Sequence, residues 1–457
     1  MPSSLTDKAA TELACVYQGT ERFRDSCLGE PFYREHEGNR YCVLHFPGPD
    51  KTKEFEEALQ RKMAARNFNF CGVWFPGRQS FFKTEFNGKV DFNSATFNDE
   101  ASFFEAVFRG RTEFKGTKFK SAADFWTVHF HGEADFFGAE FHGEARFSYS
   151  TFHRDVFFRD TNFIKKAVFF DATFEGLAVF GGIFNGEADF TLASFNERAV
   201  FTEASFKDYL KFWGNSTRQV FGEQSSLRLQ DARIEKPEYL FFNTVALRPH
   251  WFVDVDARQF NFNNIAWRYT DIHEEIEELK KREVSGPHEK LAIACQRLAA
   301  NAKENHRHDE VSLFRYLAMD VRRRKKWGGF TPWKLEWWYW AASGYGRRPL
   351  QALIVLLGIW LLFASLYICV GFARPSPGRS DEGNLAATRP DETGAPLKPS
   401  RSLLYSLGVM TLQKPDPPPV TTMAQSLVMM ETILGPLQAA LFVLAVRRRF
   451  AADLSEE

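Results

Sequence analysis

Phenylalanine recurs between residues 70 and 212 at spacings that alternate between five and six residues. Of the 26 intervals in this stretch, only the one from Phe180 to Phe184 breaks the alternation. A small or β-branched residue, most often Ala, stands two positions before the Phe in 24 of 27 cases. A repeat this regular is typical of a solenoid, in which each unit buries its apolar face only against its neighbours. The repeated residues are Phe70, Phe75, Phe81, Phe86, Phe92, Phe97, Phe103, Phe108, Phe114, Phe119, Phe125, Phe130, Phe136, Phe141, Phe147, Phe152, Phe158, Phe163, Phe169, Phe174, Phe180, Phe184, Phe190, Phe195, Phe201, Phe206 and Phe212.

The spacing of the repeat also distinguishes a β-solenoid from a helical rod. On an α-helix, steps of five and six residues place successive Phe side chains roughly 140° apart, so the helix would be apolar all round. In each Ala-x-Phe pair, by contrast, the two side chains lie on one side of a short extended segment. Turn-forming residues follow many of the Phe residues, as in Asn87-Gly88 and His131-Gly132, so the chain bends after each segment. The repeat therefore predicts a mainly β solenoid.

The stretches 133–141 (EADFFGAEF), 166–174 (KAVFFDATF) and 187–195 (EADFTLASF) resemble the pentapeptide-repeat family, in the variant with Phe at the central inward position. The resemblance covers about 145 residues and implies a right-handed quadrilateral β-helix with the central residues stacked inside. The extra residue in every second repeat predicts a coil period of about 22 residues instead of about 20. The residues expected in the inner stack include Phe136, Phe141, Phe147, Phe169 and Phe174.

The segments on either side of the repeat complete the expected domain organisation. Residues 52–66 carry Phe55, Leu59 and Met63 at helical spacing, which predicts an amphipathic helix that caps the open end of the solenoid. The expected order is an N-terminal Cys/His segment at 1–50, a capping helix at 51–67, the solenoid at 68–234, irregular coils and a helical juxtamembrane region at 235–326, and a membrane module at 327–457. Within the juxtamembrane region, helices are expected at 271–284, from Pro287 and at 309–325.

The first 50 residues contain three cysteines and one histidine that match a tetrahedral Cys3His structural zinc site. The gap of two residues between the last cysteine and the histidine suits chelation from one turn. The alternative is a small cap with three buried, unreactive cysteines, and the long spacings between the first three residues do not decide between the two. We expect at most this one zinc and no other cofactor. The four candidate ligands are Cys15, Cys27, Cys42 and His45.

Six cysteines in a chain of 457 residues do not form a disulfide framework. Residues 1–20 lack the apolar stretch of a signal peptide. Both features predict that the N-terminal bulk of the chain lies in a reducing compartment.

Two apolar stretches near the C-terminus predict membrane-spanning helices. Residues 350–372 contain no formal charge and are long enough to cross a bilayer, and a second span is expected at 426–446. Basic residues flank both spans on the same side, and the Trp-rich segment 333–340 resembles an aromatic belt at the membrane interface. We therefore expect a bacterial-type, multi-pass protein of the cell inner membrane, with both termini and the solenoid in the cytoplasm and residues 373–401 outside.

Residues 327–457 also resemble a two-transmembrane potassium-channel-like module, with a re-entrant candidate at 402–413 between the two spans. The resemblance rests on the run from Ser402 to Leu407 with Thr411, and on the run from Glu431 to Pro436. It implies a filter of backbone carbonyls after Thr411, but the residues there are Leu412-Gln413-Lys414-Pro415-Asp416, so a glycine-bearing filter is missing.

Three residues of this module are pore or gating candidates: Thr411, Lys414 and Glu431. Lys414 lies where cations would pass, and Glu431 is the one ionisable residue within a span. Such residues tend to face a bundle interior, a pore or a polar partner. The alternative for Glu431 is a structural hydrogen bond to the re-entrant segment.

The sequence contains no Gly-x-Ser-x-Gly, His-Glu-x-x-His or phosphate-binding glycine loop, so we expect no enzymatic activity. A formal net charge of zero argues against nucleic acid as a partner. The first functional hypothesis is a membrane-anchored scaffold whose cytoplasmic solenoid binds an unknown protein. The second is an ion-channel-like or transport protein, tetrameric, with a degenerate pore regulated by the solenoid. The missing filter favours the first, and the re-entrant segment with Glu431 favours the second.

Overall fold

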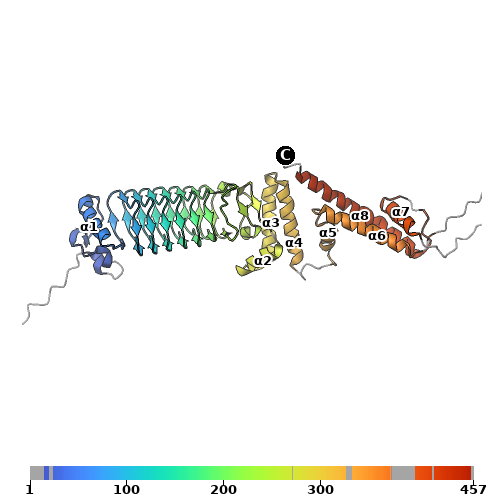
Figure 1. Cartoon of the computed structure of the whole chain (residues 1–457), viewed down its shortest axis with the longest axis horizontal. Coiled ribbons are helices and arrows are strands. Elements are labelled where there is room, and N and C mark those ends of the chain that lie inside the picture. The colour runs from blue at the N-terminus through green and yellow to red at the C-terminus, as the bar shows by residue number, and fades with distance from the viewer. Residues whose placement is uncertain are drawn as a thin grey trace, which may run out of the picture. The chain divides into compact units, whose positions relative to one another are not determined.

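The computed structural model describes residues 15–19, 24–269, 271–325, 332–370, 372, 397–413 and 416–453. The chain forms two compact units, Met1–Asn301 and Ala302–Glu457. The first contains a β-solenoid, whose coils follow one another from blue to green in Figure 1, and the second is built from helices.

Four parallel sheets form the four faces of the solenoid. Strands that pair within a face are one coil apart: Ala123 of β12 pairs with Ala145 of β16, which in turn pairs with Ala167 of β20. The structure therefore confirms the predicted β-solenoid and its coil length. Most strands have only two residues, because the chain must turn a corner after each segment that carries an inward Phe.

The first face contains β6 (Val90–Asp91), β10 (Thr112–Glu113), β14 (Ala134–Asp135), β18 (Val156–Phe157), β22 (Ala178–Val179), β26 (Arg198–Val200) and β29 (Ser226–Arg228). The second contains β3 (Trp74–Phe75), β7 (Thr96–Phe97), β11 (Lys118–Phe119), β15 (Glu140–Phe141), β19 (Asn162–Phe163), β23 (Ile183–Phe184), β27 (Ser205–Phe206) and β30 (Arg233–Ile234). The third contains β4 (Gln79–Ser80), β8 (Ala101–Ser102), β12 (Ala123–Asp124), β16 (Ala145–Arg146), β20 (Ala167–Val168), β24 (Ala188–Asp189), β28 (Leu210–Trp213), β31 (Leu240–Asn243) and β33 (Asn261–Asn263). The fourth contains β5 (Glu85–Phe86), β9 (Val107–Phe108), β13 (His129–Phe130), β17 (Thr151–Phe152), β21 (Thr173–Phe174) and β25 (Ser194–Phe195).

Phe rings one coil apart stack nearly parallel in the interior of the solenoid. The ring centroids of Phe114 and Phe136 are 4.8 Å apart with 2° between the ring planes. Rings from opposite faces meet edge to face, as Phe125, next to β12, and Phe136, next to β14, do at 5.7 Å and 89°. Both arrangements are favourable for aromatic pairs. The five residues expected in the inner stack are all buried: Phe136, Phe141, Phe147, Phe169 and Phe174.

The one irregular interval of the repeat corresponds to a shorter coil. Two residues after every second repeat Phe, the regular turns contain a residue with positive φ, such as Thr127 at 57°. Between Phe180 and Phe184 this residue is missing, and β19 pairs with β23 at a separation one residue shorter than in the preceding coils. Gly182 allows this tight turn, because a Cβ there would lie 2.3 Å from the carbonyl oxygen of Thr161.

The regular coil length ends after β28. Residues 214–225 form an insertion, since Arg198 of β26 pairs with Ser226 of β29, a much longer step along the chain than the one from Ala178 to Ala199 before it. Parallel pairing then continues through β31 and β33 and ends with β32 (Ala246–Leu247) and β34 (Ala266–Trp267). The solenoid therefore extends to Trp267, beyond the boundary predicted at residue 234.

Helical segments follow the last coils. The short 3-10 helices η4 (Pro237–Tyr239) and η5 (Pro249–Phe252) lie within these coils. α2 (Ile272–Lys281) and α3 (Pro287–Glu304) come next, at the positions predicted for the first two helices of this region.

The N-terminal end of the solenoid carries a small cap. Phe55 of α1 (Thr52–Ala64) is fully buried and packs edge to face on Phe75 of the first coil at 5.4 Å. α1 thus covers the apolar end of the Phe stack, as predicted for residues 51–67. The rest of the cap consists of η1 (Val16–Gly19), η2 (Arg24–Cys27), the hairpin β1 (Phe32–His36) and β2 (Asn39–Cys42), and η3 (Pro49–Lys51).

The second unit contains α4 (His308–Arg324), α5 (Leu335–Ser343), α6 (Pro349–Tyr367), α7 (Pro399–Met410) and α8 (Thr422–Asp453). α6 and the part of α8 from Thr422 to Arg447 are long and apolar enough to cross a membrane. The first of these helices ends at Tyr367, five residues before the end predicted for the span at Phe372.

Candidate functional site

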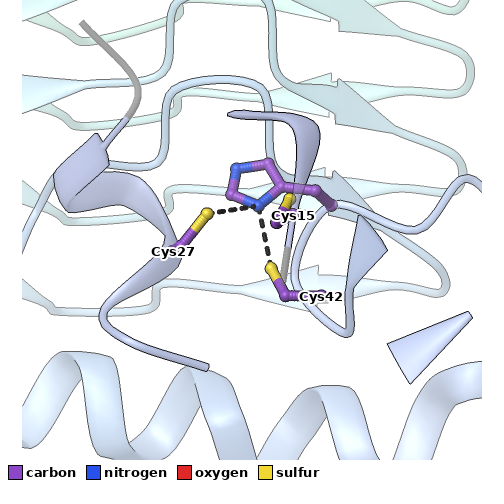
Figure 2. Close-up of side chains that lie close together, drawn as sticks. Cys15, Cys27 and Cys42 are labelled. Carbon is purple, nitrogen blue, oxygen red and sulfur yellow. Dashed lines mark hydrogen bonds between the residues drawn. The ribbon is translucent and has the colours of Figure 1, made fainter. Parts of the chain in front are cut away.

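The cap brings three cysteines and one histidine together from separate segments (Figure 2). Cys15 precedes η1, Cys27 ends η2 and Cys42 ends β2, while His45 lies in the turn that follows β2. All four predicted ligands are buried, and their ligand atoms lie within 4.8 Å of one another. In a tetrahedral site with Zn–S bonds of about 2.3 Å, the sulfur atoms are about 3.8 Å apart. The cluster therefore has the size and donor atoms of a closed metal site.

The hydrogen bonds of His45 orient its ring for metal ligation. Its Nε2 lies 3.1 Å from the carbonyl oxygen of Cys71 and 3.0 Å from the hydroxyl oxygen of Ser26. A carbonyl oxygen only accepts hydrogen bonds, so Nε2 carries the proton and donates it to Cys71. The other nitrogen, Nδ1, then presents a lone pair to the sulfur atoms of Cys27 at 3.5 Å and Cys42 at 3.1 Å. A ligating histidine is commonly held in this way by its second nitrogen.

Two buried lysines lie beside the thiols. The Nζ of Lys51 donates to the carbonyl oxygens of Val43 at 2.6 Å and Leu44 at 3.1 Å. The Nζ of Lys62 donates to the carbonyl oxygen of Ser26 at 2.9 Å. Neither lysine forms an ion pair with a carboxylate within the described part of the chain.

The electrostatics of the cap suit an anionic metal complex. Burial lowers the pKa of Lys51 to about 7 and the pKa of Lys62 to about 8, and the neighbouring cysteines act in the opposite direction. Hydrogen bonds from the thiols of Cys27 and Cys42 lower the pKa of Cys15 far below its usual range. A divalent ion with three thiolates and one imidazole has a net negative charge, which the two buried ammonium groups would balance. All four ligand positions come from protein, so such an ion would stabilise the cap and take no part in a reaction.

Glu431, a second predicted site residue, is fully buried in α8. The hydroxyl of Tyr367 in α6 donates to Oε2 of Glu431 at 2.6 Å, and the hydroxyl of Ser406 in α7 donates to Oε1. The carboxylate therefore links the three helices of this part of the chain. Its two oxygens each accept a hydrogen bond from a side chain, as a buried carboxylate requires.

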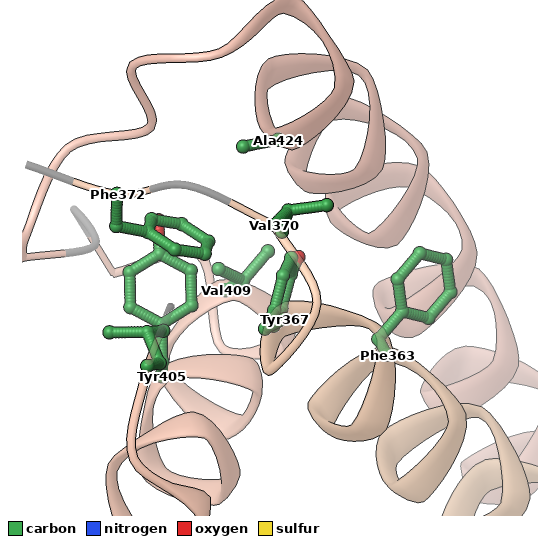
Figure 3. Close-up of a cluster of buried hydrophobic side chains, with 8 residues drawn as sticks. Phe363, Tyr367, Val370, Phe372, Tyr405, Val409 and Ala424 are labelled. Carbon is green, nitrogen blue, oxygen red and sulfur yellow. The ribbon is translucent and has the colours of Figure 1, made fainter. Parts of the chain in front are cut away.

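α7, which contains most of the re-entrant candidate 402–413, packs against both α6 and α8 through a cluster of apolar side chains (Figure 3). The indole N–H of Trp360 donates to the carbonyl oxygen of Leu403 at 3.0 Å, which fixes α7 against α6. Gly435 allows a close approach of α8, because a Cβ there would lie 2.8 Å from Cγ of Met410. The cluster consists of Phe363, Tyr367, Val370, Phe372, Leu397, Tyr405, Val409 and Ala424.

The other two pore candidates are not part of this cluster. Thr411 is exposed, and its hydroxyl donates back to the carbonyl oxygens of Leu407 at 2.9 Å and Gly408 at 3.0 Å. Lys414 lies outside the described residues. Among the described residues, Glu431 is therefore the only one of the three candidates whose side chain forms hydrogen bonds with other helices.

One surface feature of the solenoid was missed by the sequence analysis. Five aromatic side chains line the corner between the third and fourth faces, one in each of five successive coils, and we call them the aromatic stripe. Neighbouring rings have centroids 5.5 Å to 6.1 Å apart, and between 44% and 50% of the surface of Phe82, Trp126 and Tyr149 is exposed. The stripe consists of Phe82, Phe104, Trp126, Tyr149 and Phe170.

The opposite corner of the solenoid is polar. At the positions that correspond to the stripe it carries Asn93, Lys115 and Arg159, with a single aromatic residue, Phe137. The sequence signal for the stripe is an aromatic residue directly after the central Phe in four of the five coils, at Phe82, Phe104, Trp126 and Phe170, whereas Tyr149 lies two residues after Phe147. This signal is easily overlooked, because the inward Phe residues dominate the same segments.

Comparison with known proteins identifies the repeat. Residues 81–129 and 114–162 match the family described as pentapeptide repeats (9 copies). The matched residues lie in the regular coils of the solenoid, and this part of the chain is similar to pentapeptide-repeat proteins. The matched family does not reach residues 327–457, where the structure shows two apolar helices in the place of the predicted potassium-channel-like module.

Among solved structures, the chain is similar to trypsin-treated QnrB1, a plasmid-mediated fluoroquinolone resistance protein. The sequence identity is 13%, the TM-score is 0.14, and the match covers 46% of this chain and 94% of that chain. No match was found among curated proteins.

Proposed function

We propose that this protein is a membrane-anchored, non-enzymatic scaffold whose pentapeptide-repeat solenoid binds a partner protein through the aromatic stripe. The observation that carries the proposal is the stripe itself, which presents five aromatic rings in a row along one corner of the solenoid. Aromatic residues are enriched at protein interfaces and among the residues that dominate binding energy.

The solenoid holds the stripe rigid. Each aromatic residue of the stripe lies next to strands that pair with the neighbouring coils, so the spacing of the rings is set by the stacking of the coils. A partner would bind these rings with little loss of backbone or side-chain entropy. Phe104 and Trp126, at the centre of the stripe, have ring centroids 5.5 Å apart and form its expected energetic centre.

The membrane anchor is inferred from α6 and α8. Apolar side chains on α6 are widely exposed, with Leu350 67%, Ile354 60% and Leu361 51% exposed. A soluble protein would expose such a surface to water at a high free-energy cost, whereas lipid chains would cover it. Both termini and the solenoid are proposed to be cytoplasmic, because the basic residues that flank the spans lie on the same side.

The metal site of the cap is proposed to hold one structural zinc ion. Sulfur and imidazole ligands in a closed set of four are typical of structural zinc. The ion would fasten the segments around Cys15 and Cys27 to the hairpin, and so keep the cap on the end of the solenoid. The alternative of an ion-channel-like or transport protein stays a prediction.

The test is site-specific photocrosslinking of the full-length protein in cells. A photoreactive phenylalanine analogue at position 104 or 126 is expected to give an adduct with one defined protein, and the same analogue at position 137 is expected to give none. Phe137 is the matched control, since it is 47% exposed on the same solenoid but lies on the polar corner.

The adduct protein is then purified and its affinity measured directly. Replacing both Phe104 and Trp126 by Ser should weaken binding roughly a hundredfold, whereas Phe137→Ser should change it by less than about twofold. Equal adducts from positions 126 and 137, or equal loss of affinity in the two variants, would rule out the stripe as the binding surface.

A further inference from the structure

A polar cavity of about 330 Å³ lies between the last coils of the solenoid and α2. Arg198 of β26 and Ser226 of β29 line it from the solenoid, and Arg282, directly after α2, lines it from the helical side. Trp251 of η5 also lines it. The cavity lies entirely within the first unit of the chain, and its volume suits a small ligand.

Arg198 and Arg282 line this cavity, and a third arginine, Arg228, lies close enough to Arg282 to lower its pKa. Arg198 and Ser226 are directly paired in the sheet, and Arg228 is two residues after Ser226. Side chains two residues apart on a strand point to the same side, so the side chains of Arg198 and Arg228 both point outward from the same face of the solenoid. Arg282 approaches from the end of α2. Within the described part of the chain, none of the three guanidinium groups forms an ion pair or a side-chain hydrogen bond.

The carboxylates around the cavity have other partners. Glu274 pairs with Arg248 at 3.4 Å, and Glu278 pairs with Lys281 at 2.7 Å. Glu275, beneath them, accepts hydrogen bonds from the backbone N–H of His250 at 3.1 Å and from its Nδ1 at 2.7 Å. Glu223 lines the rim and is exposed to solvent. The acidic residues of α2 thus bind other groups directly, and Glu278 and Glu275 compensate the charge of Arg282 only in part.

The pKa values of two of these arginines are lowered by burial and by the charges of their neighbours. Burial and then the positive charge of Arg228 lower the pKa of Arg282 to about 10; Glu278 and Glu275 act in the opposite direction, and Arg198 lowers the pKa by a smaller amount. Burial and the charge of Arg198 also lower the pKa of Arg228. Partly buried like charges that are compensated only in part destabilise the folded protein.

Two further donors at this place have no acceptor. The indole N–H of Trp251 is buried and has no hydrogen-bond partner, and the same is true of the Nε–H of Arg228. Trp251 is only 1% exposed, so its N–H is cut off from bulk solvent. Buried donors without acceptors are rare in proteins and call for an explanation. An acceptor-rich ligand in the cavity would satisfy them.

We propose that this cavity binds a small phosphate-bearing ligand, held by Arg198, Arg228 and Arg282. Guanidinium groups bind phosphate oxygens through paired, charge-assisted hydrogen bonds. A phosphate dianion offers more acceptor oxygens and more charge than a carboxylate, and so matches three arginines and an indole N–H better. The proposal is independent of the aromatic stripe and of the membrane anchor.

The test measures the thermal stability of the full-length protein in detergent, with inorganic phosphate as the probe. Phosphate should raise the melting temperature of the solenoid in a saturable manner, and sodium chloride at the same ionic strength should not. Arg228→Met and Arg282→Met should each weaken phosphate binding roughly tenfold or more. Arg78→Met is the control, because Arg78 pairs with Glu100 on another part of the solenoid and its loss should leave phosphate binding unchanged.

The stability of the same variants without phosphate separates a ligand site from a structural role. Because the arginines repel one another, Arg282→Met should raise the melting temperature of the phosphate-free protein. A lower melting temperature of this variant in the absence of phosphate would show that Arg282 serves the fold, and would overturn the proposal.

The source of the phosphate is distinguished by two further arms. Stabilisation by free phosphate or by glycerol phosphate supports a soluble ligand. Stabilisation only by vesicles that contain phosphatidic acid, and not by vesicles of phosphatidylcholine alone, supports the same chemistry presented by a lipid headgroup. Absence of stabilisation in all of these arms would rule out a phosphate site.

Discussion

The solenoid and the C-terminal helices bury opposite kinds of side chains. In the solenoid the interior is a stack of Phe rings and the charged residues point outward. In the second unit Leu350, Ile354 and Leu361 are exposed, and Glu431 is fully buried. This difference is what the proposed membrane anchor would require: the solenoid would lie in water, and α6 and α8 in a surrounding without water, where polar groups must be satisfied inside the protein.

The cap is the exception in the first unit, since it buries Lys51 and Lys62 beside three thiols. The proposed metal ion would account for this exception, because it would turn the thiols into thiolates that balance the lysines. The comparison is therefore open to tests at three places: the exposed apolar helices, the charged cap and the two types of core.

The largest effect is expected when α6 and α8, the proposed membrane helices, are removed from the chain. The full-length protein should stay with the membrane fraction after an alkaline carbonate wash, whereas a chain that ends at residue 325 should be released almost completely. The physical reason is the apolar surface of α6 and α8, which lipid covers. Release of the full-length protein by the wash would show that these helices pack in a soluble protein and would remove the contrast.

Loss of the proposed metal ion from the cap is expected to have the second-largest effect. Purified protein is expected to contain one zinc ion per chain, and Cys42→Ser should abolish it and unfold the cap, because structural zinc can contribute roughly 10–16 kcal/mol to the folding of small domains. Metal analysis and limited proteolysis of residues 15–66 are the measurements. Cys369→Ser is the matched control, since Cys369 is exposed and distant in sequence from the cluster. Metal-free wild-type protein with an intact cap would contradict the assignment.

The apolar core of the solenoid provides a pair of adjacent residues with opposite environments. Phe136 is fully buried and Phe137 is 47% exposed. Phe136→Ala should lower the free energy of unfolding by about 3–5 kcal/mol, as truncation of a buried Phe does, and Phe137→Ala should change it by less than about 0.5 kcal/mol. Chemical unfolding followed by the β-sheet circular dichroism signal measures both. Similar losses in the two variants would mean that the inward and outward positions are assigned wrongly.

The smallest expected effect is that of the polar core in the second unit. Glu431→Leu should destabilise the packing of α7 by about 1–3 kcal/mol, because the hydroxyl of Tyr367 loses its acceptor and the hydroxyl of Ser406 keeps only the carbonyl oxygen of Trp360. Thermal unfolding in detergent measures this loss, and Thr432→Val, at an exposed neighbouring position, is the control. Adding Tyr367→Phe and Ser406→Ala to Glu431→Leu should restore most of the stability, since no buried hydroxyl then lacks a partner. A triple variant less stable than Glu431→Leu alone would contradict this account.

The regular part of the solenoid could be predicted because its information is local. Each coil repeats the same short pattern, so the spacing from Phe136 to Phe158 already contains the length of a coil. The end of the solenoid could not be predicted in this way. The insertion at 214–225 interrupts the period, and the last coils are shorter than the regular ones, as the pairing of Ala246 with Ala266 shows. Their membership in the solenoid depends on strand pairing, which the spacing of Phe no longer reports.

The candidate metal cluster and the polar core around Glu431 could also be predicted only in part from the sequence. The types of residue in the cluster, three cysteines and one histidine, were apparent from the sequence, but the distances of Cys15 and Cys27 along the chain did not indicate whether they meet. The contact of Glu431 with a hydroxyl on each of two other helices depends on how α6, α7 and α8 pack. The early end of α6 has the same origin, since Val370 and Phe372 leave the helical path and join the apolar cluster around Tyr405.

The sequence by itself determined the architecture of the rod, the inward position of its Phe residues and the presence of two apolar helices, because each of these follows from periodicity or composition within a short window. Only the tertiary structure decided which side chains from distant segments meet. It placed Phe82, Phe104 and Trp126 in one row along a corner, and it brought Arg198 and Arg282 to one cavity, close to Arg228. The physical reason is that such contacts depend on the rotation of each coil and on the packing of helices against it, to which residues far apart in the chain contribute together.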